Sequence, residues 1–267
     1  MKVATALASA AIEPREARLL LAEACGFSEA SVLAHPEREL PAAAASGFAA
    51  MAARRRAGEP IAYILGRREF YGLMLAVSPA VLIPRPETEL LVELALERRP
   101  STVLDLGTGC GAIALAIKQV LPQARVVAVD ASAAALVLAQ RNAARHSLAI
   151  DLRHGLWFAP VAGERFDLIV GNPPYVAEGD PHLAQGDVRF EPRAALVAGP
   201  DGLESIRDIV GQAKNFLAPG GWLLLEHGLG QETAVRQLLA SCGFDAIATW
   251  PDLAGIARVS GGRLKSD

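Results

Sequence analysis

Short aliphatic runs alternate with segments of helical periodicity over the last two thirds of the chain. The aliphatic runs predict buried strands at 102–106, 125–130, 150–153, 168–170 and 222–226. Between the first three of these strands, apolar positions at helical spacing predict two helices, one over 112–121 and one from 133 to about 145. Ser132 is the expected N-cap of the second helix. This alternation is typical of a doubly wound, mainly parallel sheet.

The end of the chain has a different pattern. Residues 244–250 and 256–260 predict two strands, and the connection 251–255 is too short to contain a helix. We therefore expect an antiparallel pair at the sheet edge. The predicted fold class is α/β, with a mainly parallel seven-stranded sheet whose final strand is antiparallel.

The first third of the chain is rich in alanine and is predicted to be helical. One helix begins at Pro14 and ends before Gly26, and a second covers 42–56. The pattern then changes to one typical of a hairpin, and a further helix begins near Pro86. We expect a small helical domain over 1–66, a β-hairpin linker over 67–82 and an α/β domain over 83–267.

Composition excludes several classes of protein. Hydrophobic residues make up 52% of the chain, enough for a sizeable core, and the net charge of −3 gives no general attraction to nucleic acid. The cysteines (Cys25, Cys110 and Cys242) are far apart, and neither they nor the histidines show metal-ligand spacing. No signal peptide or membrane-spanning run is evident. We expect a soluble, cytoplasmic protein without a metal.

The turn after the first predicted strand of the sheet has the pattern of a nucleoside-binding loop. Gly107, Gly109 and Gly111 allow close approach of a ligand, and Asp130 ends the next strand, where an acid binds ribose hydroxyls. The glycine spacing differs from the dinucleotide pattern, and Asp105 suits an ammonium group better than a pyrophosphate. These features favour S-adenosyl-L-methionine over NAD.

A second motif follows the strand at 168–170. Gly171 and the prolines at 173 and 174 end that strand, so Asn172 lies at the carboxyl edge of the sheet, where ligands bind in such folds. An amide side chain, carbonyl groups held by prolines and the ring of Tyr175 suit a planar group that carries NH₂. For an isolated Asn-Pro pair, a simple turn is the alternative.

Taken together, these motifs resemble class I methyltransferases that act on amide or exocyclic amino nitrogens. The likeness extends to three further segments, at 63–72, 83–89 and 189–196, and covers about residues 10–262. The whole pattern is similar to the protein-(glutamine-N5) methyltransferase family, which modifies peptide-chain release factors. The resemblance implies a release factor as the protein partner and the helical domain as the part that recognises it.

The resemblance also implies roles for individual residues. The residues implied to bind the cofactor are Asp105, Gly107, Thr108, Gly109, Cys110, Gly111, Asp130, Trp157 and, at the border with the substrate, Asn172. Of these, Trp157 would pack on the adenine. The glutamine would be held by Asn172, Pro173, Pro174 and Tyr175, with Asn172, Pro173 and Tyr175 as the catalytic set. Relatives often carry an acid where this chain has Leu156, so a side-chain contact to the adenine amino group is not expected here.

Other interpretations stay open on sequence alone. The alternative function is a DNA or RNA exocyclic amino-group methyltransferase, because a base NH₂ fits the same motif; the charge and the lack of a large basic region disfavour it. We expect a monomer without direct nucleic-acid contact. The arginine run at 54–56 is interpreted as a solvated helix end or a contact to an acidic partner. Glu191 and Arg193 form a structural pair or border the substrate. His227 is interpreted as a satisfied strand-end residue and not as a base.

Overall fold

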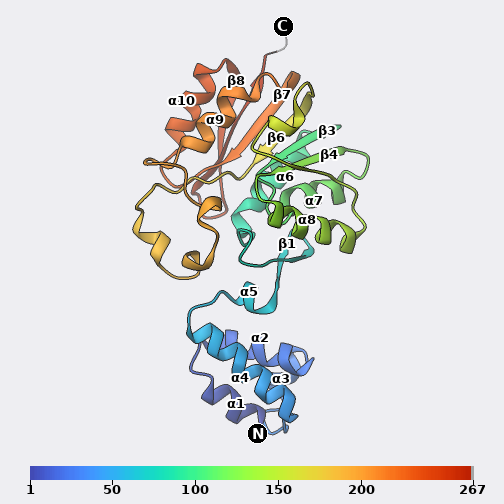
Figure 1. Ribbon diagram of the computed structural model, residues 1–267, viewed down its shortest axis with the longest axis vertical. Coiled ribbons are helices and arrows are strands. Elements are labelled where there is room, and N and C mark those ends of the chain that lie inside the picture. Colours follow the sequence, from blue (N-terminus) through green and yellow to red (C-terminus); the bar gives the residue numbers. More distant parts are fainter. Residues whose placement is uncertain (266–267) are drawn as a thin grey trace. The chain divides into compact units, whose positions relative to one another are not determined.

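The computed structural model describes residues 1–265 and divides into two compact units (Figure 1). Residues 1–67 and 184–190 form the first unit, and residues 68–183 with the chain from 191 onward form the second. A short segment of the carboxyl-terminal part of the sequence therefore belongs to the amino-terminal unit. No helix in the described part of the chain is both long and apolar enough to cross a membrane.

The first unit is helical, as the sequence predicts. Its helices are α1 (Val3–Ser9), α2 (Pro14–Cys25), α3 (Glu29–Ala34), α4 (Ala42–Arg56) and α5 (Ile61–Leu65). Gly26 and Gly66 end α2 and α5 in the left-handed conformation, with φ of 65° and 68°. Small and aliphatic side chains, including Leu20, Leu21 and Phe48, form a buried core of its own.

The arginine run at the end of α4 makes ion pairs and hydrogen bonds inside this unit. Arg55 donates to Glu16 at 2.8 Å and to Asp187 at 2.9 Å, and Arg54 pairs with Glu59. Arg56 donates to the carbonyl of Ala10 at 2.7 Å. The run was interpreted as a solvated helix end or a contact to an acidic partner, and in the structure Arg54 and Arg55 contact acidic side chains of the same chain. Arg55 fastens the segment 184–190 to α2 and α4.

The second unit contains the predicted seven-stranded sheet. Its strands are β3 (Thr102–Leu106), β4 (Arg125–Asp130), β5 (Asp151–His154), β6 (Phe166–Gly171), β7 (Leu217–Glu226), β8 (Phe244–Pro251) and β9 (Ala257–Leu264). Their order is β5-β4-β3-β6-β7-β9-β8, and neighbours are parallel from β5 to β7. Strand β9 runs antiparallel to both β7 and β8. The predicted fold class, including the antiparallel final strand, is confirmed.

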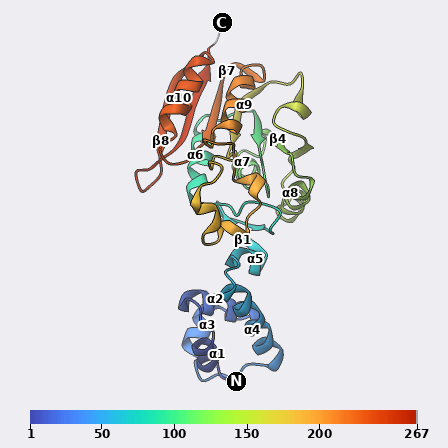
Figure 2. The ribbon, with the colours of Figure 1, turned by 60° about the vertical axis from the view of Figure 1, so that its left-hand side comes forward.

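Helices cover both faces of this sheet (Figures 1 and 2). On one face lie α6 (Glu89–Glu97), α7 (Ala112–Val120) and α8 (Ala133–His146), and on the other lie α9 (Glu204–Ala213) and α10 (Glu232–Ser241). The last two helices were not predicted from the sequence. Single-turn helices occur at Pro86–Thr88, Ala159–Val161, Pro181–Ala184, Val188–Phe190 and Arg193–Ala195.

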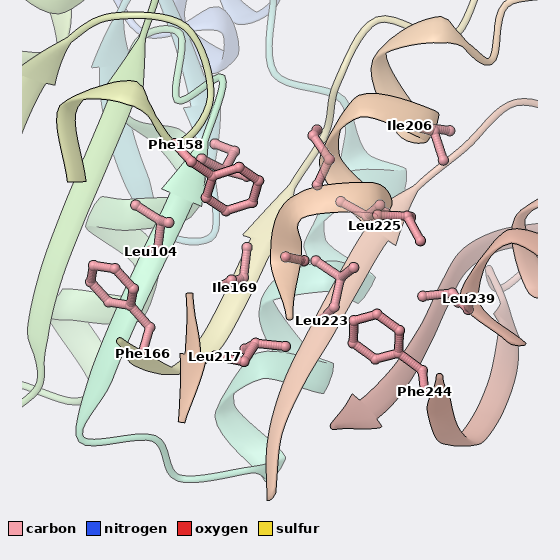
Figure 3. Close-up of a cluster of buried hydrophobic side chains, with 14 of the residues drawn as sticks. Leu104, Phe158, Phe166, Ile169, Ile206, Leu217, Leu223, Leu225, Leu239 and Phe244 are labelled. Atoms are coloured by element: carbon pink, nitrogen blue, oxygen red, sulfur yellow. The ribbon is translucent and has the colours of Figure 1, made fainter. Parts of the chain in front are cut away.

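One hydrophobic core lies between the sheet and the pair α9 and α10 (Figure 3). Alternate residues of the central strands, such as Leu104, Ile169 and Leu223, point to this side and meet Ile206 and Leu239. This burial fixes the central strands, and with them the loops that leave their carboxyl ends.

The predicted hairpin is formed by β1 (Arg67–Phe70) and β2 (Leu73–Ala76). Its two-residue turn has positive φ at Tyr71 (49°) and Gly72 (77°), the conformation that suits a tight hairpin. At the end of β2, Asn142 of α8 accepts from the Ala76 amide at 2.7 Å and donates to the Ala76 carbonyl at 3.1 Å. It also donates to the carbonyl of Cys110 at 2.9 Å. One buried side chain thus links the hairpin, α8 and the glycine loop.

Replacing Asn142 by Ala should lower the free energy of unfolding by about 2–4 kcal/mol, because three buried main-chain groups lose their partner. Urea unfolding followed by tryptophan fluorescence measures the effect, since Trp157, Trp222 and Trp250 all lie in the second unit. The matched control is Val137→Ala on the exposed face of the same helix, which should change stability by less than about 0.5 kcal/mol. Equal losses in the two variants would contradict this account of Asn142.

Candidate active site

A pocket of about 520 Å³ lies at the carboxyl edge of the parallel strands, within the second unit. Many of the residues proposed from the sequence line it: Gly107, Thr108, Gly109, Cys110, Asp130, Trp157, Asn172 and Pro174. Asp105, Gly111, Pro173 and Tyr175 are not among the residues that line it. The two motifs recognised in the sequence therefore share one cavity.

The glycine loop leaves β3 in a conformation that requires glycine. Gly107, Gly109 and Gly111 have φ of 73°, 56° and 87°. A Cβ on Gly111 would lie 3.2–3.3 Å from Leu115 and Ala139, so this glycine allows α7 to pack closely on α8. Gly107 and Gly109 border the pocket instead. Gly111 is thus needed for the close packing of α7 on α8, whereas Gly107 and Gly109 allow a ligand to approach the backbone closely.

Asp130 holds the other side of this loop. Its Oδ2 accepts from the Gly109 amide at 2.8 Å, and its Oδ1 accepts from the Ser132 amide at 2.8 Å. Each carboxylate oxygen keeps a further lone pair, and the side chain borders the pocket. An acid in this position can both shape the loop and accept hydrogen bonds from a ligand.

Asp105 is fully buried beneath the loop. The Thr108 hydroxyl donates to its Oδ2 at 2.6 Å, whereas Oδ1 has no hydrogen-bond partner among residues 1–265. Burial raises the pKa of this carboxyl to about 7, although the Thr108 bond opposes the rise. An unpaired buried carboxylate oxygen beside a ligand pocket suits a ligand that carries a positive charge.

Trp157 contributes an aromatic surface to the pocket. Its φ is +47°, an uncommon conformation for a side chain of this size, and its ring lies 3.7 Å from where a Cβ on Gly107 would be. Leu156 also lines the pocket and is 57% exposed. A flat nucleobase would therefore meet an indole ring and an aliphatic side chain here.

Cys110 lines the pocket but is not set up as a nucleophile. It is buried, and burial raises the pKa of its thiol to about 12. The thiol is therefore protonated at neutral pH and unreactive. In the described part of the chain, no group of three or more His, Cys, Asp and Glu side chains could hold a metal ion.

The Asn172 side chain is held by a residue that is distant in the sequence. It donates through Nδ2 to the hydroxyl of Thr88 at 3.2 Å, and Thr88 belongs to the single helical turn before α6. Thr88 is buried and was not singled out in the sequence. Since Nδ2 is engaged, Oδ1 is the group of Asn172 that remains to accept hydrogen bonds from a ligand.

Tyr175 is held by its hydroxyl and by its backbone. The hydroxyl donates to Glu226 Oε1 at 3.4 Å, and the Tyr175 carbonyl accepts from Gln231 at 3.0 Å. Glu226 ends β7 and is 2% exposed, so burial raises its pKa to about 7. An acid after an apolar strand is the signal that identified Asp130, and it could have identified Glu226.

The contacts of Glu191 and His227 bear on the interpretations that the sequence gave for these two residues. Glu191 forms an ion pair with Arg85 and also accepts a hydrogen bond from the Ile83 amide at 3.3 Å. Arg85 reaches Glu191 because the proline-rich segment around it lies against the loop at 191–198. His227 is buried and bonded to Ser260 at 2.9 Å and to the Gly228 carbonyl at 3.1 Å. Its interpretation as a satisfied residue is confirmed.

The strand order, the antiparallel last strand and a pocket at the carboxyl edge define a class I S-adenosylmethionine-dependent methyltransferase. Residues 86–189 match the family described as Methyltransferase small domain, and residues 2–66 match the PrmC N-terminal domain. The chain belongs to the family of release factor glutamine methyltransferases, which confirms the resemblance drawn from the sequence. It is 51% identical over 263 residues to the "Release factor glutamine methyltransferase" of Xylella fastidiosa (strain Temecula1), covering 97% of this chain and 96% of that one. With the Escherichia coli (strain K12) protein of the same description it is 49% identical over 255 residues, or 93% and 91% of the two chains.

Solved structures with lower sequence identity share the fold. A methyltransferase from Pyrococcus furiosus has a TM-score of 0.58 at 20% identity and covers 80% of this chain and 98% of its own. The T. thermophilus 16S rRNA N2 G1207 methyltransferase in complex with AdoMet and guanosine has a TM-score of 0.57 at 24% identity, covering 74% of this chain and 50% of its own.

The buried carboxyl of Asp105 predicts a pH-dependent stability. Its pKa of about 7 in the folded protein lies above the ordinary value of 3.8, so folding favours the protonated form. The resulting stabilisation is complete below about pH 4 and is lost as the pH rises through about 7. The unfolding free energy of the wild type, minus that of Asp105→Asn, should therefore fall over this range. Urea unfolding at several pH values measures it, and a difference independent of pH would contradict the assignment.

Proposed function

We propose that this protein transfers the methyl group of S-adenosylmethionine to the side-chain amide nitrogen, N5, of a glutamine in a peptide-chain release factor. The observation that carries the proposal is the placement of Asn172, whose free Oδ1 shares one pocket with the glycine loop and Asp130. Full-length similarity to release factor glutamine methyltransferases supports the choice of substrate.

The residues on the β3 and β4 side of the pocket fit this cofactor. The unpaired Oδ1 of Asp105 suits its ammonium group, and the remaining lone pairs of Asp130 suit the ribose hydroxyls. Gly107, Thr108, Gly109 and Cys110 would border the methionine part, with Gly111 shaping the loop behind them. Trp157 would pack on the adenine, beside Leu156.

The difficult partner in the reaction is the substrate amide, because its nitrogen shares its lone pair with the adjacent carbonyl. When bound, the cofactor supplies an electrophilic methyl group on its sulfonium. Asn172 Oδ1 and the Pro173 carbonyl would accept the two N–H bonds of the glutamine amide. These acceptors would orient the nitrogen and oppose the positive charge that develops on it. A strong base before attack is not required, since the N–H becomes acidic only as the new bond forms.

The prolines and Tyr175 complete the substrate side. Pro174 lines the pocket, and Pro173 is buried behind it, so the turn that presents Asn172 is stiff. Tyr175 would pack against the plane of the glutamine amide, with its hydroxyl held by Glu226. Asn172, Pro173 and Tyr175 would then form the catalytic set, and all four residues of the motif would bind the substrate.

A release factor as the substrate also implies a protein partner and a cellular location. We infer a cytoplasmic monomer that docks a release factor without direct nucleic-acid contact. The helical domain, proposed as residues 1–66, with a linker at 67–82 and a catalytic domain over 83–267, would recognise the release factor. The match of residues 2–66 to a separate domain family supports this division.

The proposal is tested by incubating the protein with methyl-labelled S-adenosylmethionine and, separately, with release factor, DNA or RNA. Label should enter the release factor, and mass spectrometry of its peptides should place the methyl group on a glutamine side chain. Labelling of DNA or RNA alone would overturn the proposal in favour of an exocyclic amino-group methyltransferase.

Asn172→Ala should lower the turnover number by about 10²–10³-fold, because the substrate nitrogen loses its orienting acceptor. The affinity for S-adenosylmethionine, measured by calorimetry, should change little, because Asp105 and Asp130 remain. The matched control is Asn215→Ala, at an exposed position beyond α9, which should leave both quantities unchanged. An Asn172→Ala enzyme with near wild-type turnover would rule out this role.

A further inference from the structure

The side chain of Gln231 meets three loops at the carboxyl edge of the sheet. Gln231 follows β7 and directly precedes α10. Its Oε1 accepts a hydrogen bond from the Gly228 amide at 2.8 Å, and its Nε2 donates to the Tyr175 carbonyl at 3.0 Å. The carbonyls of Gly202 and Asp201 lie farther from Nε2, at 3.4 and 3.5 Å. Gln231 is not among the residues that line the pocket, and the proposed chemistry gives it no role.

The partners of Gln231 decide how its amide group is turned. A backbone N–H can only donate and a backbone carbonyl can only accept. The Gly228 amide therefore requires Oε1, and the Tyr175 carbonyl requires Nε2. The reverse orientation would place two donors together at Gly228 and two acceptors together at Tyr175. In the favourable orientation, Gln231 ties the Tyr175 backbone to the loop that precedes α10.

The loops around Gln231 are packed tightly against Tyr175. A Cβ on Gly202 would overlap the Tyr175 carbonyl oxygen and lie 2.9 Å from Gln231 Nε2. A Cβ on Gly228 would lie 3.2 Å from Cδ2 of the Tyr175 ring. Both positions are occupied by glycine, which permits these close approaches. The carbonyl and the ring of Tyr175 are thus enclosed by neighbouring backbone, and its hydroxyl donates to Glu226 at 3.4 Å.

We propose that Gln231 is a positioning residue that sets the ring of Tyr175 against the substrate amide, an inference that rests on the proposed function. The carbonyl carbon and the side chain of Tyr175 are bonded to the same Cα. A hydrogen bond that holds the carbonyl therefore restricts the direction in which the ring leaves the backbone. Gln231 itself would touch neither the substrate nor the cofactor, and it would act only through Tyr175.

The test replaces Gln231 by Glu, which has nearly the same shape and keeps an oxygen for the Gly228 amide. The carboxylate is ionised at about pH 8, so it cannot donate and would repel the Tyr175 carbonyl. With labelled S-adenosylmethionine and release factor at saturation, the turnover number should fall about tenfold, because the ring no longer keeps the substrate amide in one orientation. The affinity for S-adenosylmethionine and the number of binding sites, both from calorimetry, should stay unchanged.

Gln237→Glu makes the same substitution at an exposed position of α10 and is the matched control. It should leave the turnover number unchanged. Gln231→Glu is expected to fold, because a negative charge at the start of a helix is favourable. Should thermal melting show that it does not, Gly228→Ala provides the test. Gly228 does not adopt a positive φ, so the added Cβ acts by pressing on the Tyr175 ring, and turnover should fall about threefold.

A double substitution asks whether Gln231 acts through the Tyr175 ring. In the Tyr175→Ala background, Gln231→Glu should cause less than about a twofold further loss, because no ring is left to position. A role in general stability would lower the number of binding sites for S-adenosylmethionine in both backgrounds instead.

The outcomes separate the two proposals. A wild-type protein that does not methylate the release factor overturns the proposed function and the role of Gln231 that rests on it. If the wild type does methylate it and folded Gln231→Glu keeps the turnover number, only the positioning role is overturned. A higher KM for release factor at unchanged turnover also overturns that role, because Gln231 would then affect docking alone. The same is true of an equal loss with and without the Tyr175 ring.

Discussion

The register between β3 and β6 places the two halves of the site. Leu106 pairs with Gly171 in the parallel ladder. The glycine loop, which follows Leu106, and Asn172, which follows Gly171, therefore start at the same level of the sheet. A Cβ on residue 171 would lie 3.0 Å from the Leu106 carbonyl oxygen, so glycine permits this close approach. The loop and the Asn-Pro-Pro-Tyr turn are thus fixed to each other by buried strands, whose side chains pack under α9 and α10.

Side-chain bonds then fix the surrounding loops to this frame. Asn142 ties the end of the hairpin to the glycine loop, Glu191 ties the proline-rich segment at 83–85 to the loop at 191–198, and Thr88 meets Asn172. Each bond joins segments that are far apart in the sequence, and most of the groups are buried. Hydrogen bonds of this kind add modest stability but are costly to leave unmade, so they specify one arrangement of the loops.

Two buried carboxyl groups define the electrostatics of the second unit. Asp105 and Glu226 both lie at the carboxyl edge of the sheet, and each has one carboxylate oxygen without a hydrogen-bond partner among residues 1–265. Burial raises the pKa of each to about 7. Each buried carboxyl group makes the folded protein less stable than an apolar residue at the same position would. Such a cost is expected where a site must be polar before its ligand arrives, because preorganised groups need not reorient during the reaction.

Sequence alone determined the succession of strands along the chain, the antiparallel final pair and the two motifs. Each of these depends on local pattern: aliphatic runs, glycines after a strand, an acid at a strand end and a diproline turn. It also placed Asp130 and Asn172 at one edge, since parallel strands end together. It could not supply the partners of Asn172 or Glu191, or show that residues 184–190 belong to the helical unit. Those depend on which distant segments meet, and one carboxylate can pair with any cation that the fold brings near. Only the packed tertiary structure decided that Arg85 reaches Glu191 and that Asn172 donates a hydrogen bond to Thr88.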